Sequence, residues 1–208
     1  MKKTHQLTLH IARVLSYVFH PAVVPLLFVG MFLWLHPNTF DRVQKIYIMM
    51  SVVAGTYFLP VTASLLLYRF GVIRTLEMAD KEDRKTPYIV AAVFYYFTAV
   101  ALRVVPSAQL LHMFLMGTSI VILLLLAQIP FYKASAHVAS FSGLMAAVMV
   151  MSRMNAWSPT LLIAAILAVG LIAWARLELG AHTSREVVAG FFTGFTPIFV
   201  LFYTVSQG

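Results

Sequence analysis

The chain has no cysteine and few charged residues. Of its 208 residues, 15 are Lys or Arg and only 7 are Asp or Glu, so that charged residues make up 11%. Without cysteine the protein can form no disulfide, thiolate nucleophile, zinc–thiolate site or iron–sulfur site. With 61% apolar residues, the chain is far more apolar than a soluble domain of this length. We therefore expect a membrane protein.

The net charge of +8 does not indicate a nucleic-acid-binding protein. The basic residues are scattered between apolar stretches, and no stretch interleaves them with aromatic residues on a soluble surface. Anionic membrane lipid is the expected partner for this charge, and no nucleic acid is expected.

Seven apolar stretches separate the polar parts of the chain. They predict an all-α, polytopic membrane helical bundle of about six or seven transmembrane helices, formed by one membrane-embedded domain over residues 1–208. The predicted spans are residues 14–35, 46–68, 88–105, 109–129, 138–152, 159–175 and 187–205. The fifth stretch is short for a span, so its helix is expected to begin within the polar segment before it.

The N-terminal residues 1–13 carry basic side chains between apolar ones and could lie in the membrane interface. A signal peptide is not favoured, because the apolar stretch 14–35 is too long for a signal core and has no clear small-residue cleavage site. The His20-Pro21 pair is expected to bend the first span, with a structural role for His20.

Polar and charged side chains gather in three segments, residues 69–87, 131–137 and 175–186. Two predicted crossings separate each segment from the next, so all three are expected on one face of the membrane. Polar groups at the ends of membrane spans are costly and point to a function. The predicted site is lined by Lys81, Arg84, Lys85, Lys133, Ser135, His137, Arg176, His182, Arg185 and Glu186.

The third segment has the most specific spacing. Arg176 is followed after five residues by His182, which is followed after three residues by Glu186. If this part is helical, the imidazole and the carboxylate lie one turn apart on one face. A carboxylate in that position orients the ring and stabilises its cationic form. In the second segment, a helix that begins near Ser135 would direct its N-terminal N–H groups at an anion.

These segments resemble the membrane-bound type 2 phosphatidic acid phosphatase superfamily over roughly residues 80–190. That family carries, in order, a Lys-rich segment ending in Arg-Pro, then Pro-Ser-Gly-His, then Ser-Arg, five residues, His, three residues and Asp. The chain offers Lys81, Arg84 and Lys85 for the first motif, Ser135 and His137 for the second, and Arg176, His182 and Glu186 for the third.

The chain also departs from the family pattern at five positions. In the first motif Ala79 stands where the family has Lys, and Thr86 stands where it has Arg before the proline. In the second, Ala134 and Ala136 replace Pro and Gly. In the third, Glu186 replaces Asp and is one methylene longer. The first motif is therefore degraded, whereas the two histidines and Arg176 are intact.

The resemblance implies a lipid phosphate or lipid pyrophosphate as substrate, and a reaction that requires no metal or other cofactor. It implies that His182, oriented by Glu186, attacks phosphorus to form a phosphohistidine. His137 would protonate the departing lipid oxygen. It further implies that the phosphate oxygens are bound by Arg176, Ser135, Lys81, Arg84 and Lys85.

Other interpretations remain open. A non-catalytic lipid-binding or lipid-moving protein could keep the same fold after decay of the first motif, whereas an ion-coupled transporter would need charges within the spans. His112 is expected to be a packed or hydrogen-bonded core residue. Lys133 and Arg185 flank predicted helix ends, where bases commonly bind lipid headgroups, and Glu178 could pair with a neighbouring Arg.

The expected location is a bacterial cytoplasmic membrane. Lys and Arg are more numerous on the face that carries the three polar segments, and the positive-inside rule would place that face in the cytoplasm. In the bacterial enzymes of the resembled family, the site generally opens away from the cytoplasm. Several of these basic residues are candidates for binding phosphate, so the choice depends on Lys2 and Lys3, which favour a cytoplasmic site.

Overall fold

A computed structural model of the chain describes residues 2–76, 80 and 82–206, and helices are the only regular secondary structure in these residues. The all-α prediction is confirmed. The α-helices are α1 (Lys2–Val18), α2 (Val24–Leu35), α3 (Arg42–Val52), α4 (Leu59–Arg69), α5 (Lys85–Ala101), α6 (Gln109–Gln128), α7 (Ala136–Arg153), α8 (Pro159–Glu178) and α9 (Ser184–Ser206). Short helices connect them, namely η1 (Pro21–Val23), η2 (Val53–Phe58), η3 (Glu82–Arg84), η4 (Leu102–Val104) and η5 (Pro106–Ala108).

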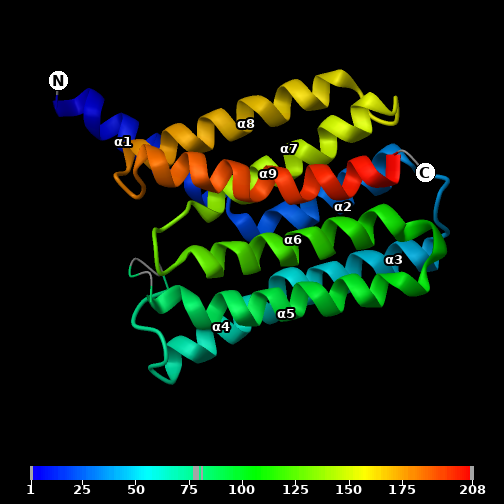
Figure 1. The fold of residues 1–208 in the computed structure, drawn as a ribbon, viewed down its shortest axis with the longest axis horizontal. Helices are drawn as coiled ribbons and strands as arrows, with labels where there is room; N and C mark the ends of the chain where they lie inside the picture. The colour runs from blue at the N-terminus through cyan, green and yellow to red at the C-terminus, as the bar shows by residue number, and fades with distance from the viewer. Residues whose placement is uncertain (1, 77–79, 81, 207–208) are drawn as a thin grey trace. The chain divides into compact units, whose positions relative to one another are not determined.

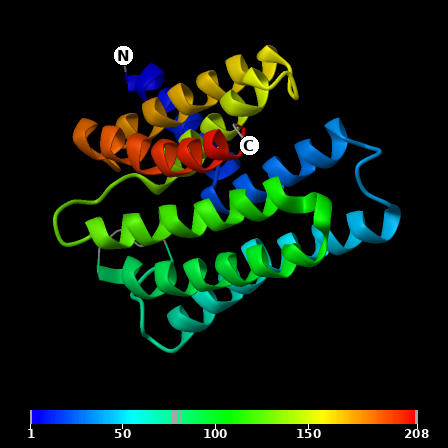
Figure 2. The same ribbon diagram turned by 45° about the vertical axis from the view of Figure 1, so that its right-hand side comes forward.

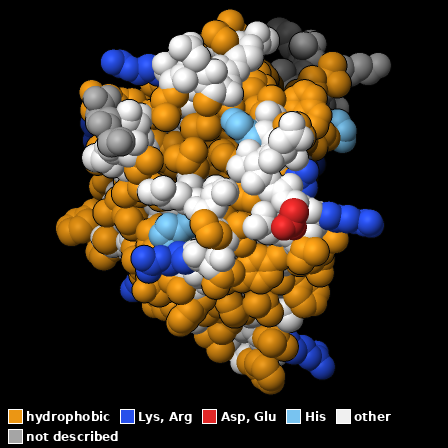
Figure 3. Space-filling model, turned by 90° about the vertical axis from the view of Figure 1, so that its right-hand side faces the viewer, with side chains coloured by type: hydrophobic (Ala, Val, Ile, Leu, Met, Phe, Trp, Pro, Cys, Tyr) orange, Lys and Arg blue, Asp and Glu red, His pale blue; other side chains and the backbone are white. Residues whose placement is uncertain are grey.

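Seven helices in the described part of the chain are long and apolar enough to cross a membrane. They are His5–Leu35, Arg42–Arg69, Glu82–Val104, Pro106–Gln128, Ala136–Arg153, Pro159–Glu178 and Ser184–Ser206. Each contains all or most of one predicted span. Apolar side chains also cover most of the molecular face drawn in Figure 3. The protein is therefore an integral membrane protein of the predicted helical class.

The chain forms two compact units. The first unit comprises Met1–Val24 and Phe131–Gly208, and the second unit comprises Pro25–Pro130. The first contains α1 and the C-terminal helices α7, α8 and α9, and the second contains α2 to α6 (Figure 1). The organisation of residues 1–208 as one membrane-embedded domain stays a prediction.

Glycines of α9 allow close helix packing in the core of the first unit. Helix α7 packs against both α8 and α9, and α1 packs against α8. A Cβ atom at Gly190 of α9 would lie 2.6 Å from the backbone oxygen of Ser135, and one at Gly194 would meet the backbone oxygen of Ala139. The Gly190-x-x-x-Gly194 spacing places both small residues on one face of α9, which lets two membrane helices approach closely.

In the second unit, α5 packs against α6, as expected for the predicted helical pair, and against η2 and α4 (Figure 2). The η2 turn is a π-helix that directly precedes the Pro60 turn of α4. Proline has no N–H for the carbonyl four residues earlier and clashes with it, so the helix widens locally at this point. Within η2, Gly55 leaves room for the Thr98 side chain of α5.

Two boundaries differ from the predictions. Helix α1 runs without a break from Lys2 to Val18, so residues 1–13 and the start of the first predicted span form one helix. The helix is interrupted at the predicted His20-Pro21 pair, where His20 caps η1 by accepting the N–H of Ala22. The predicted loop 69–87 is too long, since α5 begins at Lys85 and accommodates Pro87 in its first turn, where a proline leaves no further donor unpaired.

Candidate functional site

His182 lies in the short turn that joins α8 to α9. Gly180 ends α8 with a φ of 60°, a left-handed conformation that costs glycine little. The N–H of Ala181 then donates to the Arg176 carbonyl, and the N–H of Gly180 donates to that of Leu177, which completes a helix-ending Schellman motif. His182 is consequently outside any helix, and the prediction that it shares a helical face with Glu186 is wrong in that respect.

The expected imidazole–carboxylate pair nevertheless forms. The side chain of His182 is 1% exposed, and its Nδ1 lies 3.5 Å from Glu186 Oε2. The same Nδ1 lies 3.0 Å from the backbone oxygen of Lys133. A carbonyl can only accept, so this contact indicates a proton on Nδ1 and leaves Nε2 with the ring lone pair.

Glu186 reaches the imidazole because it also caps α9. Its Oε2 accepts the N–H of Thr183, and its own N–H donates to Thr183 Oγ1, so the two residues form a capping box. Its Oε1 accepts the N–H of Lys133, and its backbone oxygen accepts the N–H of Ser135. Glu186 therefore ties residues 133–135 to the start of α9.

The tied segment leads directly into α7, so the second motif begins a helix as predicted. Ser135 is the N-cap residue, and His137 lies in the first turn. The Ser135 hydroxyl is completely buried, does not cap the helix and has no hydrogen-bond partner among the residues that the structure describes. A buried hydroxyl without a partner costs about 1–3 kcal/mol. An anion at this helix N-terminus would supply the missing acceptor.

Arg176 and His137 meet at Ser16 of α1, which the sequence analysis did not select. Arg176 Nη1 donates to Ser16 Oγ at 3.3 Å, and His137 Nε2 lies 3.2 Å from the Ser16 backbone oxygen. The ring of His20 lies edge-on to that of His137, with centroids 5.6 Å apart. Ser16 was missed because its neighbours are apolar; the available signal was that Ser16 is the single serine of the predicted span 14–35, which also contains His20.

The His182–Glu186 pair and the Arg176–His137 pair lie close enough to interact electrostatically. The His137 ring lies within interaction range of both Arg176 and His182. The first unit thus brings together two imidazoles, a guanidinium, a carboxylate and a buried hydroxyl from two separated segments of the chain, and Ser16 joins them from a third. This set can bind an oxyanion, present a ring nitrogen to it and transfer a proton nearby.

Comparisons with protein-family models, with curated proteins and with solved structures find no match to this chain. Within the described residues, no three His, Asp or Glu side chains gather closely enough to hold a metal ion. Functional interpretation therefore rests on the residues and on the resemblance of their motifs.

The candidates of the first motif belong to the second unit. Lys85 Nζ lies 2.6 Å from Glu82 Oε2, an ion pair within one helical turn. Arg84 forms a side-chain hydrogen bond with Tyr88. Lys81 lies outside the described residues. Both described bases thus have local partners in their own unit.

Three further residues of the first unit have ordinary surroundings. Lys133 contributes its backbone N–H and carbonyl to the site, as described above. Arg185 is exposed in the first turn of α9. Glu178 pairs with His5 at 3.8 Å rather than with an Arg as predicted.

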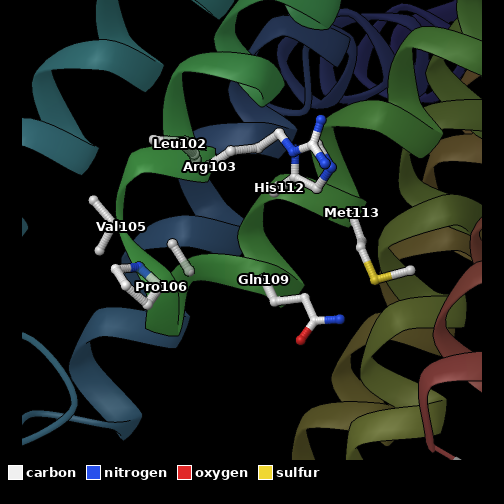
Figure 4. Close-up of a pocket in the computed structure, with 8 residues that line it drawn as sticks. Leu102, Arg103, Val105, Pro106, Gln109, His112 and Met113 are labelled. Carbon is white, nitrogen blue, oxygen red and sulfur yellow. The ribbon is translucent and has the colours of Figure 1, made fainter. Parts of the chain in front are cut away.

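His112 and Arg103 line a hollow at the turn between α5 and α6, together with Gln109 and Met113 (Figure 4). The Nδ1 atom of His112 lies 2.7 Å from the Ala99 backbone oxygen. The predicted hydrogen bond of His112 is confirmed and joins α6 to α5, but the side chain is only partly buried and is not a core residue.

Proposed function

We propose that the protein is an integral membrane lipid phosphate phosphatase, which hydrolyses a phosphomonoester or pyrophosphate of a lipid through a phosphohistidine intermediate. One observation carries the proposal. The buried His182 is held by Lys133 and Glu186 in the same unit in which Arg176 and His137 share Ser16. A purely structural role for the two histidines does not require a partly buried guanidinium and carboxylate beside them.

His182 is the nucleophile in this proposal. Its Nδ1 proton is directed at the Lys133 carbonyl, so the Nε2 lone pair attacks phosphorus while the bond to the lipid oxygen breaks. The Glu186 carboxylate near Nδ1 stabilises the positive charge that the ring gains in the attack. Water then attacks the phosphohistidine, which releases inorganic phosphate and restores the neutral imidazole.

Arg176, Ser135 and the N-terminus of α7 bind the phosphate oxygens. The guanidinium supplies charge, the buried hydroxyl gains its missing partner, and the helix dipole adds positive potential. His137 in its cationic form protonates the departing lipid oxygen through Nδ1, because its Nε2 is directed at the Ser16 carbonyl. Lys85 and Arg84 have local partners in the second unit, and the proposal assigns no step to them.

A phosphate-release assay on the purified protein in detergent tests the proposal. The substrates are phosphatidic acid, phosphatidylglycerol phosphate, a polyprenyl pyrophosphate, a sphingoid phosphate and lipid A, with a soluble phosphate ester for comparison. We expect release from at least one lipid and a preference for that lipid over the soluble ester, because the protein is membrane-embedded. Equal or better hydrolysis of the soluble ester would contradict a lipid substrate.

The same preparation separates catalysis from simple binding. A non-catalytic lipid-binding protein would take up a lipid phosphate without releasing phosphate or becoming labelled. A phosphatase of the proposed type should retain radiolabelled phosphate on His182 after rapid acid-free denaturation, since phosphohistidine is stable only away from acid. Binding without release from any lipid of the set would replace the proposed function by the non-catalytic one.

A further inference from the structure

We infer that Ser16, in the first membrane span, is a positioning residue of the site: its hydroxyl holds the Arg176 guanidinium and its carbonyl holds the His137 ring. This inference deepens the proposed function and rests on it. It adds α1 to the site. None of the three motifs, which lie in the polar segments 69–87, 131–137 and 175–186, includes a residue of that helix.

The geometry assigns two tasks to two atoms of one residue. Arg176 Nη1 donates to Ser16 Oγ over a sequence separation of 160 residues, and the His137 contact to Ser16 O spans 121. Ser16 is only 9% exposed. The contact with Arg176 uses the side chain of Ser16, and the contact with His137 uses its backbone. Ser16→Ala therefore removes the contact with Arg176 and leaves the contact with His137 in place.

The partner of the Ser16 hydroxyl differs in kind from the partners of other hydroxyls in the helices. Thr56 and Thr98 donate to a carbonyl of their own helix one turn earlier, and Ser119 donates to the Ala92 carbonyl of a neighbouring helix. Ser16 instead receives a guanidinium from α8. A serine that only satisfied itself within α1 would make no such contact.

Holding one end of the guanidinium has a clear effect on anion binding. Arginine has a long, flexible side chain, and fixing it before the substrate arrives reduces the entropy lost on binding. The contact with Ser16 is made by Nη1, and the planar fork of five N–H groups in a guanidinium suits the oxygens of a phosphate. The same serine fixes the distance between the phosphate-binding group and the proton donor His137, which the transition state requires.

Ser16→Ala, Ser16→Thr and the control Ser119→Ala test this role. Ser119 is also a buried serine, but it donates to the Ala92 carbonyl in the second unit. With the preferred lipid, Ser16→Ala should lower kcat/KM about 10-fold and weaken inhibition by orthovanadate by a similar factor, as expected for loss of a hydrogen bond to a charged group. Ser16→Thr should recover most of the loss, and Ser119→Ala should match the parent protein.

A double-mutant cycle with Arg176→Lys asks whether Ser16 acts through Arg176. Lysine keeps the charge but not the planar fork, so adding Ser16→Ala to this variant should change kcat/KM less than twofold. Full additivity would overturn the inference. It would also be overturned by unchanged kcat/KM in Ser16→Ala, or by a lower melting temperature with normal kinetics, which would show a packing role alone.

A binding arm keeps the two proposals separable. Orthovanadate should raise the melting temperature of the parent protein and raise it less for Ser16→Ala. If no lipid is hydrolysed but this difference remains, the proposed function fails and the role of Ser16 in anion binding stands. If orthovanadate does not stabilise the parent protein, the inference about Ser16 is overturned as well.

Discussion

Buried polar side chains behave differently in the two units. In the second unit they bind nearby backbone atoms: Thr56 and Thr98 donate within their own helices, and Ser119 donates to the adjacent helix of the α5–α6 pair. In the first unit Ser142 and Thr193 also bind nearby backbone atoms, but Arg176 and His182 in addition contact segments that are distant in the chain.

The difference shows which polar groups the fold itself needs. A hydroxyl bonded to a neighbouring carbonyl satisfies itself in an apolar surrounding and demands no further partner. A partly buried guanidinium, an imidazole–carboxylate pair and a buried Ser135 hydroxyl with no partner among the described residues are costly to assemble, and such costs are usually accepted only at functional sites. The first unit is thus the part of the protein in which activity should be sought.

The largest effect should follow from loss of the proposed nucleophile. Asparagine at position 182 can still donate to the Lys133 carbonyl, but it offers no ring nitrogen for attack. We expect His182→Asn to lower phosphate release by about 10³-fold or more. His112→Asn is the matched control in the second unit, because its histidine also binds a backbone carbonyl. Equal losses in the two variants would remove the functional distinction between the units.

Glu186 should show a smaller effect that separates its two roles. Glu186→Gln keeps a group that can complete the capping box with Thr183, but removes the negative charge beside His182. We expect roughly a 100-fold loss of kcat with little change in melting temperature. Glu186→Ala should additionally lose about 1 kcal/mol of stability, because the cap is lost. Full activity of Glu186→Gln would reduce this residue to a helix cap.

Close packing of α7 and α9 should affect both stability and the site. A Cβ at position 190 would collide with the Ser135 backbone, so Gly190→Ala must push α9 away from the start of α7. We expect a loss of about 1–3 kcal/mol of stability, measured in detergent, and a lower kcat. Gly170→Ala in α8 meets no atom within 4 Å and should be neutral. Similar behaviour of both variants would contradict the importance of this contact.

The smallest effect is expected from a polar group of the second unit. Thr98→Val replaces a hydroxyl that donates to the Phe94 carbonyl with a methyl group of the same shape. The carbonyl keeps its helical hydrogen bond, so stability should change by less than about 1 kcal/mol. Phosphate release should be unchanged. A loss of activity here, with the melting temperature retained, would show that the second unit takes part in the reaction.

Much of the fold was predictable from local sequence. The apolar stretches indicate seven spans, because a helix of this length satisfies its own backbone hydrogen bonds within a hydrocarbon layer. The position of His182 was also readable, although its helical placement was predicted wrongly. Gly180 is a helix-ending residue, and Thr183-x-x-Glu186 is a capping box that places His182 between two helices. Such signals depend on atoms within one turn of each other.

The contacts that distinguish the first unit depend on tertiary structure. No local pattern states that Ser16 receives Arg176, that Lys133 offers its carbonyl to His182, or that Gly190 lies against Ser135. Each depends on which faces of separate helices pack together, and in a membrane that choice follows from shape and hydrogen bonding rather than from hydrophobicity, which is nearly uniform along the spans. The sequence by itself therefore determined the helices and the candidate residues, whereas only the packing of α1, α7, α8 and α9 decided which of those residues share a site.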